Sequence, residues 1–257
     1  MKLAGKIVLV TGASSGIGRA IAMEVAKLGA DVIITARRTD KLTELKNELV
    51  KTYGVDVLNL ELDVSKQKNV EAVIGGLTDK WSNIDILVNN AGLALGLSPF
   101  PGCKISDWDN MIDVNVKGLL YVTHAVLPIM IKNNRGHIVN IGSVAGHQIY
   151  PNGNVYSATK YAVNAISQSL RVDLLGKHIR VTEIDPGAVG DTEFSTVRFN
   201  SKEKSDEFYS KFTPLLSEDI ADAVGYCITR KEHVNISNMV IYPIDQASAN
   251  HINRQTQ

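Results

Sequence analysis

Seven short runs of apolar residues alternate along the chain with longer stretches in which apolar and polar positions mix. Within each run the apolar residues are nearly continuous, which is the pattern of parallel strands that helices bury on both faces. The runs are rich in valine, isoleucine and leucine and lie at residues 7–10, 32–35, 57–60, 84–88, 137–141, 179–184 and 239–242.

The stretches between these runs have helical periodicity. In residues 41–51, for example, Leu42, Leu45 and Leu49 fall at positions i, i+3 and i+7, on one face of a helix. About six such helices alternating with seven strands predict an α/β fold, a doubly wound parallel seven-stranded sheet with helices on both faces. Because no linker-like segment or internal repeat divides the chain, we expect a single domain over residues 1–257.

One connection breaks this alternation. About thirty residues separate the strand that ends near Asp185 from a helix that begins near Ser217. A connection of this length in a compact domain is usually functional or disordered. Its aromatic residues favour a lid with a short helix, which we place at residues 188–216, over a disordered linker. These aromatic residues are Phe199, Phe208, Tyr209 and Phe212.

The composition excludes several classes of protein and site. The 257 residues carry 27 Lys and Arg against 27 Asp and Glu, a balance that argues against sequence-independent binding to nucleic acid. The two cysteines, Cys103 and Cys227, do not support a disulfide scaffold or a zinc site, and the six histidines lack metal-binding spacing. No apolar run approaches the ~18 residues of a membrane span, and the first run is too short for a signal peptide. We therefore expect a soluble cytoplasmic protein without a metal site, a membrane or a nucleic-acid partner.

A glycine-rich turn follows the first expected strand and precedes a helical pattern over residues 19–28. In that position glycines let the chain turn sharply and let backbone N–H groups approach a pyrophosphate, which the helix N-terminus also attracts. We favour dinucleotide binding over a glycine-rich turn without a ligand because strand, turn and helix occur together at the N-terminus. The residues concerned are Gly12, Ala13, Ser14, Ser15, Gly16, Ile17 and Gly18.

The end of the second expected strand distinguishes between the two nicotinamide cofactors. Enzymes that use NAD usually carry an acidic residue there, which binds the ribose 2′-hydroxyl. Here Arg37 and Arg38 follow the strand instead. A guanidinium pairs with a 2′-phosphate, whereas a carboxylate repels it. The alternative is two solvated arginines in a loop, but beside the glycine-rich turn we favour NADP.

A serine, a tyrosine and a lysine suggest the reaction chemistry. Tyr156 and Lys160 lie at positions i and i+4 of an expected helix, so both side chains lie on one face. The ammonium of Lys160 is then expected to lower the pKa of Tyr156 from ~10 towards neutrality. Such a pair arises by chance on many helices, but Ser143, thirteen positions before Tyr156 at the end of an expected strand, makes the set specific.

With these residues the chain resembles the short-chain dehydrogenase/reductase family, which has a Rossmann-type fold. The matching segments span most of the chain in the family's order: the turn at residues 11–18, Asn89-Asn90-Ala91-Gly92, Asn115, Ser143, residues 156–160, and Pro186-Gly187. The resemblance implies that Tyr156 exchanges the proton of the carbonyl or alcohol oxygen and that Ser143 donates a hydrogen bond to this oxygen. Lys160 would hold the nicotinamide ribose, and Asn115 would support a water relay to Lys160.

The resemblance also implies the remaining cofactor contacts. Asp63 and Val64 would contact the adenine, and Asn90, with Ala91 and Gly92 beside it, the adjacent ribose. The nicotinamide end would contact Pro186, Gly187, Val189 and Thr192.

Several segments resemble a narrower branch, the NADP-dependent 3-hydroxy acid dehydrogenases that oxidise serine, allo-threonine and related acids. They are residues 84–96, 150–156, 185–199, 233–236 and 242–248, and the Asp-Gly-Gly turn typical of 3-oxoacyl-carrier-protein reductases is absent from the last strand. A carboxylate substrate needs a cationic partner. Arg198 in the expected lid and Arg254 in the tail are candidates; the alternative for Arg198 is an exposed arginine or an intersubunit ion pair. For His147, which lies near Ser143, we favour a structural or solvent-facing role over contact with the substrate.

The first hypothesis is therefore a cytoplasmic, NADP-dependent oxidoreductase that reversibly oxidises a small 3-hydroxy acid at its 3-hydroxyl group. A broad carbonyl or 3-oxoacyl reductase with the same residues is the first alternative. The second is an NADP(H)-binding sensor with little turnover, although a sensor needs no proton donor at the nicotinamide. The family resemblance further implies a homotetramer.

Overall fold

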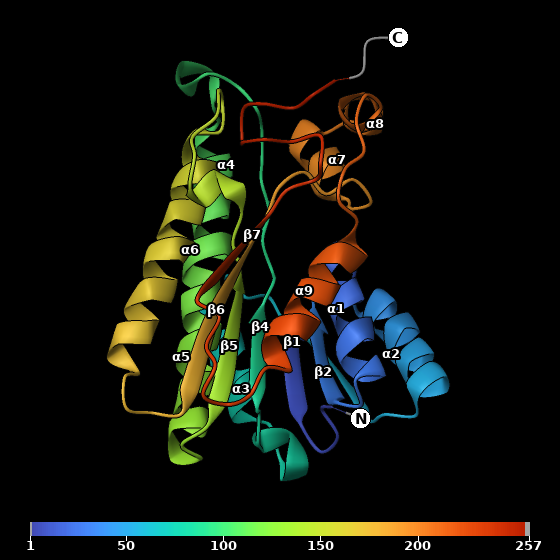
Figure 1. The fold of residues 1–257 in the computed structure, drawn as a ribbon, viewed down its shortest axis with the longest axis vertical. Coiled ribbons are helices and arrows are strands. Elements are labelled where there is room, and N and C mark those ends of the chain that lie inside the picture. Colours follow the sequence, from blue (N-terminus) through green and yellow to red (C-terminus); the bar gives the residue numbers. More distant parts are fainter. Residues whose placement is uncertain (1, 255–257) are drawn as a thin grey trace.

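The computed structural model describes residues 2–254, in which all seven expected strands form one parallel sheet (Figure 1). The strand order is β3-β2-β1-β4-β5-β6-β7. The strands are β1 (Ile7–Thr11), β2 (Asp31–Ala36), β3 (Val57–Glu61), β4 (Ile86–Asn89), β5 (Gly136–Ile141), β6 (Ile179–Pro186) and β7 (Asn238–Ile241). The chain builds outward from β1 in one direction and then from β4 in the other. Ligands of doubly wound sheets bind at such a reversal, beyond the carboxyl ends of the strands.

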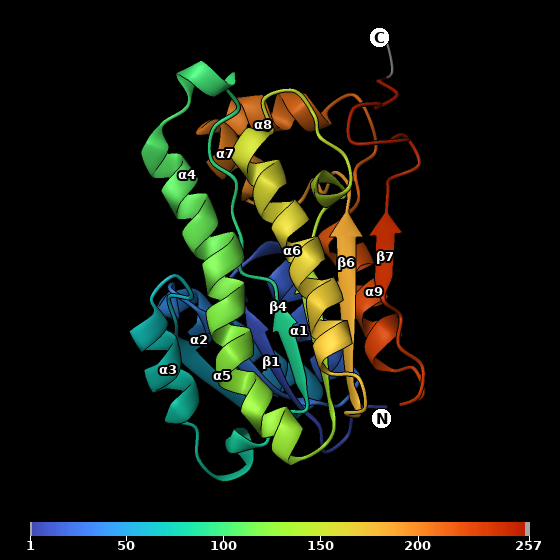
Figure 2. The same ribbon diagram turned by 90° about the vertical axis from the view of Figure 1, so that its left-hand side faces the viewer.

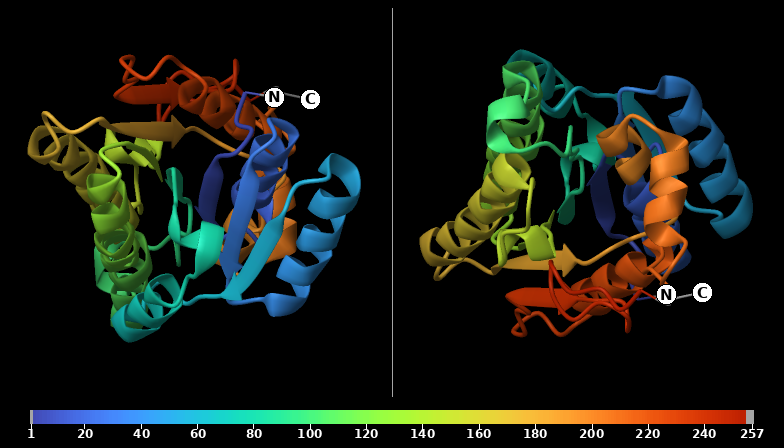
Figure 3. Two further views of the ribbon diagram at one scale, coloured as in Figure 1. Left: turned by 90° about the horizontal axis from the view of Figure 1, so that it is seen from below. Right: turned by 90° about the horizontal axis from the view of Figure 1, so that it is seen from above.

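Helices cover both faces of the sheet, which confirms the expected doubly wound α/β fold (Figure 3). One face carries α1 (Gly16–Lys27), α2 (Thr39–Tyr53) and α9 (Ser217–Ile228). The other carries α3 (Gln67–Gly75), α4 (Ile105–Ile112), α5 (Leu119–Lys132) and α6 (Asn154–Asp173). Short 3₁₀ turns lie at η1 (Asp79–Ser82), η2 (Phe100–Gly102) and η4 (Val144–Gly146).

The continuous apolar character of the strands has a direct structural cause. In β1, Val8 and Val10 pack into a core cluster with Val224 of α9, whereas Leu9 packs into a second cluster with Val122 of α5. Successive strand residues point to opposite faces. Both faces of β1 are therefore buried, so its residues 7–10 are all apolar and do not alternate between apolar and polar.

The helix on the second face is interrupted by a wider turn. A π-helical segment, η3 (Asp113–Gly118), joins α4 to α5 without ending the helix. Over Ile105–Lys132 the combined helix is long and apolar enough to span a membrane by length and composition alone. Core helices meet the same criterion, and this one buries Val122, Val126 and Met130 against the sheet.

The segment expected to be a lid, residues 188–216, lies above the carboxyl ends of the strands (Figure 2). It contains two helices, α7 (Phe194–Phe199) and α8 (Lys202–Tyr209), where the sequence suggested one. Ring contacts among its aromatic residues hold the two helices together: the Phe199 and Phe208 centroids lie 6.0 Å apart, and those of Phe208 and Phe212 lie 5.9 Å apart. The C-terminal tail crosses beside the lid, where Arg254 Nη1 donates to the carbonyl oxygen of Phe208 at 3.1 Å.

Candidate active site

A cavity of about 730 Å³ lies between the carboxyl ends of the strands, the lid and the tail. Its walls include the glycine-rich turn after β1, the residues after β2, β3, β4 and β5, the start of α6, and residues from both lid helices. Its size falls within the range of small-molecule sites. The reversal of strand order between β1 and β4 thus coincides with a cavity large enough for a cofactor and a substrate.

Two glycines bring the backbone of the turn close to its neighbours. Gly12 has a φ of +65°, and a Cβ there would lie 2.9 Å from the Cα atom of Ala91. A Cβ at Gly18 would lie 2.4 Å from the carbonyl oxygen of Gly12. Only glycine fits at these positions. Helix α1 begins here, so its first backbone N–H groups are available at the cavity wall for an anion.

Ala13 does not line this cavity, and its assignment as a cofactor contact stays a prediction. Its side chain is fully buried in the core cluster under α1, and its backbone nitrogen donates to the carbonyl oxygen of Thr35 at 3.0 Å. The motif places Ala13 within the turn, but the turn directs it towards the sheet. The remaining expected residues of the turn line the cavity: Gly12, Ser14, Ser15, Gly16, Ile17 and Gly18.

Arg38 is oriented towards the turn by hydroxyl groups. Its Nη2 donates to Ser14 Oγ at 3.0 Å and to Ser15 Oγ at 2.7 Å, and its Nη1 lies 2.9 Å from a carboxylate oxygen of Glu193. Both Arg37 and Arg38 line the cavity. The two serine hydroxyls and the guanidinium form a group of donors that fits a phosphate. In this structure the lid residue Glu193 supplies the negative charge at that place.

The remaining expected cofactor contacts all lie on the same wall. Asn90 is held by the glycine-rich turn, since its Nδ2 donates to the carbonyl oxygen of Thr11 at 2.9 Å. Val64 is touched by Gly118 of the π-helical turn, where a Cβ would come within 2.7 Å of it. The full set on the cavity wall is Asp63, Val64, Asn90, Ala91, Gly92, Pro186, Gly187, Val189 and Thr192.

Ser143, Tyr156 and Lys160 come together at the inner end of the cavity. Tyr156 and Lys160 project from one face of α6, and the Lys160 Nζ lies 5.9 Å from the centroid of the Tyr156 ring. The Lys160 Nζ also donates to the carbonyl oxygen of Ile141 at 2.9 Å. Ser143 follows β5, and its Oγ accepts from the backbone nitrogen of Ala145 at 3.1 Å. Burial of the Lys160 ammonium lowers its pKa to about 8, although the carboxyl group of Asp185 acts to raise it.

The prediction that Lys160 lowers the pKa of Tyr156 is wrong for the protein without its cofactor. Burial, reinforced by Tyr150, raises the pKa of Tyr156 well above its usual range, against a hydrogen bond from Ser143 and the charge of Arg198 that lower it. Lys160 is directed to the carbonyl oxygen of Ile141 instead. The Tyr156 side chain is only 7% exposed, and this desolvation disfavours the phenolate.

Asn115 does not line the cavity but lies behind residues that do. Its Oδ1 accepts from the backbone nitrogen of Leu93, and its Nδ2 donates to the carbonyl oxygen of Leu93, both at 2.8 Å. It also donates to Thr159 on α6 at 3.0 Å. Asn115 lies in the π-helical turn, and such turns occur frequently at functional sites. The residue therefore ties α6 to the segment after β4.

Arg198 reaches the cavity from α7, whereas the two other candidates are engaged elsewhere. Its guanidinium carbon lies 5.4 Å from the ring centroid of Tyr156, and its buried Nη2 has no hydrogen-bond partner within residues 2–254. Arg254 lines the cavity, but its Nη1 is bound to the lid. His147 Nε2 lies 2.8 Å from a carboxylate oxygen of Asp185, which gives this histidine a structural contact.

Sequence reasoning missed Tyr150 as a site residue. Its ring centroid lies 5.1 Å from the Arg198 guanidinium carbon, and its buried hydroxyl has no partner in the described part of the chain. Burial raises the pKa of Tyr150, so this hydroxyl keeps its proton as a hydrogen-bond donor. No local motif marks the residue, because its importance depends on a contact with the lid 48 positions away.

These residues fit a dinucleotide with an extra phosphate. The helix N-terminus and the glycine-rich turn fit a pyrophosphate, and Arg38 with its two serine hydroxyls fits a 2′-phosphate. The wall continues from there to Tyr156, so that a bound dinucleotide has its two ends at chemically different sites.

Comparison with known proteins agrees with this geometry. A family model described as short chain dehydrogenase matches residues 6–203. A protein of Salmonella typhi named NADP-dependent 3-hydroxy acid dehydrogenase YdfG is 49% identical over 244 residues, which cover 95% of this chain and 97% of that protein. Sulfoacetaldehyde reductase 2 of Chromohalobacter salexigens is 45% identical, over 94% of this chain and 95% of that protein.

A solved structure is similar over nearly the whole chain. It is described as the closed form of serine dehydrogenase complexed with NADP⁺, with a TM-score of 0.91 and 46% identity. The match covers 98% of this chain and 100% of that one. The sheet order, the cavity and these matches lead to one conclusion: the chain belongs to the short-chain dehydrogenase family.

Proposed function

We propose that this protein catalyses the reversible, NADP-dependent oxidation of the 3-hydroxyl group of a small 3-hydroxy acid. The substrate class is supported by the Nη2 atom of Arg198, which lies in the cavity beside Tyr156. This atom is buried and has no hydrogen-bond partner within residues 2–254. Arg198 is partly exposed and its Nε donates to the carbonyl oxygen of Gly96, but its Nη2 is a buried donor whose missing partner is costly. A substrate anion would supply that partner. The preference for NADP is supported by the contacts of Arg38 with Ser14 and Ser15. It agrees with the relatives that are named NADP-dependent.

Tyr156 exchanges the proton in this proposal. Its raised pKa keeps the phenol protonated, which is the form that donates a proton to the carbonyl oxygen during reduction. Ser143 donates a second hydrogen bond to that oxygen, where negative charge develops. Lys160 holds the ribose beside Tyr156, and Asn115 keeps α6 and the segment after β4 in register for the water relay to Lys160. Bound NADP supplies the hydride acceptor at the nicotinamide.

Tyr150 and Arg198 bind the substrate carboxylate together in this proposal. Both have a buried polar atom without a partner among the described residues, and the Arg198 guanidinium carbon lies 5.1 Å from the centroid of the Tyr150 ring. A carboxylate beside this pair accepts hydrogen bonds from the guanidinium and from the phenol. Its anchoring presents the 3-hydroxyl group of a three- or four-carbon acid to Tyr156.

A second candidate substrate carries a sulfonate in place of the carboxylate. The donors of Arg198 and Tyr150 also fit that group, and one relative is named sulfoacetaldehyde reductase. The test of the proposed function is therefore a comparison of anionic and neutral substrates in the wild type and in Arg198→Ala.

For Arg198→Ala, we expect the KM of L-allo-threonine to rise by about 10-fold or more, because one charged hydrogen bond is worth ~1.5–3 kcal/mol. The KM of a neutral ketone should change little. Arg230→Ala is the matched control, since Arg230 is a partly exposed arginine beside Tyr226 that does not line the cavity. Equal changes in KM for the acid and the ketone would contradict the role of Arg198. Activity on ketones or 3-oxoacyl thioesters alone would favour a broad reductase.

A further inference from the structure

Two carboxyl groups lie buried behind the cavity, and the chemistry proposed above does not use them. Glu183 and Asp185 belong to β6, and the side chains of both are fully enclosed. Because they are two positions apart on a strand, they point to the same face of the sheet. Asn164 of α6 donates to Glu183 Oε2 at 3.2 Å. Neither carboxyl group lines the cavity.

Asp185 binds three polar groups, two from the residues that flank η4 and one from β7. The backbone nitrogen of Ser143 donates to Asp185 Oδ1 at 2.9 Å. At Oδ2, Asn238 Nδ2 of β7 donates at 2.5 Å and His147 Nε2 lies at 2.8 Å. The space around Oδ1 is also closed by Gly142, where an added Cβ would come within 1.8 Å of it. The position of this carboxylate is therefore determined on all sides.

Glu183 keeps its proton near neutral pH. Burial, with the neighbouring charge and hydrogen bond of Asp185, raises the pKa of Glu183 to about 8. Glu183 Oε1 has no donor in the part of the chain that the structure describes, and a buried carboxylate oxygen without a donor is costly. The titratable groups that face the pair are His147 after β5, Lys160 and Arg171 on α6, and Tyr242 after β7.

We propose that Asp185 is a positioning residue that fixes the backbone of Ser143, and thereby aims the Ser143 hydroxyl at the reacting oxygen. Ser143 is extended, with a φ of −176°, and η4 begins immediately after it. Asp185 holds its backbone nitrogen from one side, and the nitrogen of Ala145 holds its Oγ from the other. This inference rests on the proposed role of Ser143 as the second hydrogen-bond donor.

The first experiment compares two buried carboxylates at opposite ends of the sheet. Asp185→Ala removes the acceptor for Ser143, and we expect kcat to fall by about 10- to 100-fold, because small misplacements of a reacting group have effects of this size. The Kd of NADPH, from the fluorescence of the bound cofactor, should stay within about two-fold of wild type. The matched control is Asp85→Ala. Asp85 is also buried and accepts from a backbone nitrogen, that of Ile7, at 3.0 Å, but it lies at the amino end of β4. Its loss should lower stability and leave kcat unchanged.

A double-mutant cycle with Ser143→Ala separates positioning from a general structural role. If Asp185 acts through the Ser143 hydroxyl, Asp185→Ala should lower kcat little further once that hydroxyl is gone. Asp185→Asn retains one acceptor oxygen and should recover part of the activity. If Asp185→Ala does not fold, Asn238→Ala, which removes one donor to the carboxylate, should lower kcat a few-fold in wild type and not in Ser143→Ala.

Amide hydrogen exchange provides a readout that does not depend on the substrate. Exchange over residues 142–146 should become faster in Asp185→Ala, or in Asn238→Ala, than in the wild type and Asp85→Ala. Unchanged exchange over this segment would overturn the proposal. So would an unchanged kcat, or a fall in kcat that is equally large in Ser143→Ala. A wild type that is inactive on L-allo-threonine would instead contradict the proposed substrate, and the exchange measurement would still decide the role of Asp185.

Discussion

At the scale of single residues, motifs and contacts were predictable to different degrees. Ser143, Tyr156 and Lys160 could be found because their spacing reflects a strand end and one helix face, both of which are local. Tyr150 could not, because its contact with Arg198 exists only when the lid lies over the cavity. The pKa of Tyr156 could not be predicted either, since it depends on the burial that the whole fold imposes.

Arg38 is the residue expected to favour NADP over NAD. Its guanidinium lies beside the Ser14 and Ser15 hydroxyls, where a 2′-phosphate fits. For Arg38→Ala we expect the KM of NADP to rise by about 10-fold or more, from the loss of a charged hydrogen bond worth ~1.5–3 kcal/mol. NAD lacks the 2′-phosphate and serves as the internal control, so its KM should change little. A parallel rise for both cofactors would contradict a phosphate site at Arg38.

At the scale of elements, the prediction of the fold was accurate where packing is uniform. Every strand lies within two residues of its expected ends, because both faces of the sheet are buried and the apolar runs follow directly from that. The π-helical turn at Asp113–Gly118 was not predictable, since its apolar pattern does not differ from that of the helices around it. The burial of the Ala13 side chain was not predictable either, because a motif gives positions in the chain and not the direction of each side chain.

The buried carboxyl group of Glu183 on β6 gives stability a specific pH dependence. Its folded-state pKa of about 8 lies above the ordinary value of 4.5, so the folded protein holds a proton that the unfolded chain releases. This contribution is fully present below pH ~4.5 and is lost as the pH rises through about 8. Glu183→Gln imitates the protonated form and does not titrate.

The difference in Tm between Glu183→Gln and wild type should therefore increase in favour of the variant from pH 5 to pH 8. Thermal unfolding of both proteins in the same buffers measures it. His137 also titrates differently in the folded protein, because burial lowers its pKa to about 3. Both proteins contain this residue, so its contribution cancels in the difference in Tm. A difference that is constant over this pH range would show that Glu183 is ionised throughout.

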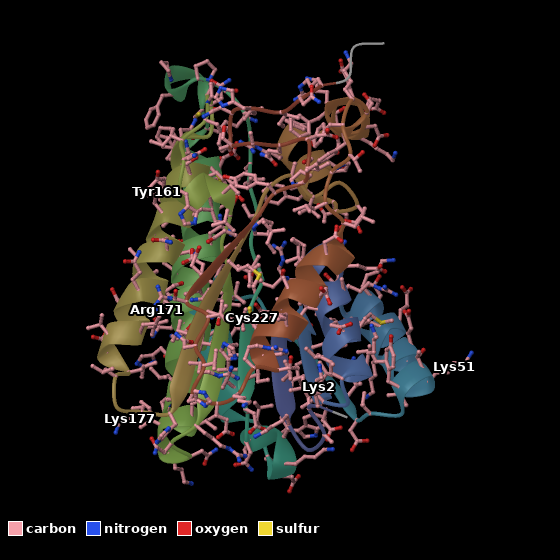
Figure 4. All side chains as sticks on the ribbon, in the orientation of Figure 1. Lys2, Lys51, Tyr161, Arg171, Lys177 and Cys227 are labelled. Carbon is pink, nitrogen blue, oxygen red and sulfur yellow. The ribbon has the colours of Figure 1, made fainter. Side chains whose placement is uncertain are left out.

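At the scale of the whole molecule, two separate surfaces carry exposed apolar side chains. One runs along α5 and α6 and includes Leu120 and Val172, the latter 73% exposed. Figure 4 labels Tyr161, another exposed side chain on α6. The other surface lies at α9 and β7, where Tyr226 is exposed and Ile244, just after β7, is 96% exposed. Two different self-complementary surfaces build a tetramer of dihedral symmetry.

We propose that the protein is a homotetramer held by these two surfaces. Light scattering after gel filtration should give four times the mass of one chain. Val172→Lys places a charge on one surface and should give a dimer, because the second surface remains intact. The matched control is Lys132→Glu at the end of α5, a change of charge outside the apolar positions, which should remain tetrameric. A monomeric wild type at micromolar concentration would contradict this assembly.

The most direct test of the central claim follows absorbance at 340 nm with L-serine, L-allo-threonine and 3-hydroxypropionate, each offered with NADP and with NAD. We expect reduction of NADP in preference to NAD, and a loss of about 10²- to 10⁴-fold in Tyr156→Phe, which removes only the proton-exchanging hydroxyl. Tyr161→Phe is the control, since the Tyr161 hydroxyl donates to a backbone carbonyl outside the cavity, and it should remain active. Undiminished turnover in Tyr156→Phe would contradict the mechanism. Tight NADPH binding without turnover of any acid, ketone or thioester would indicate a sensor instead of an enzyme.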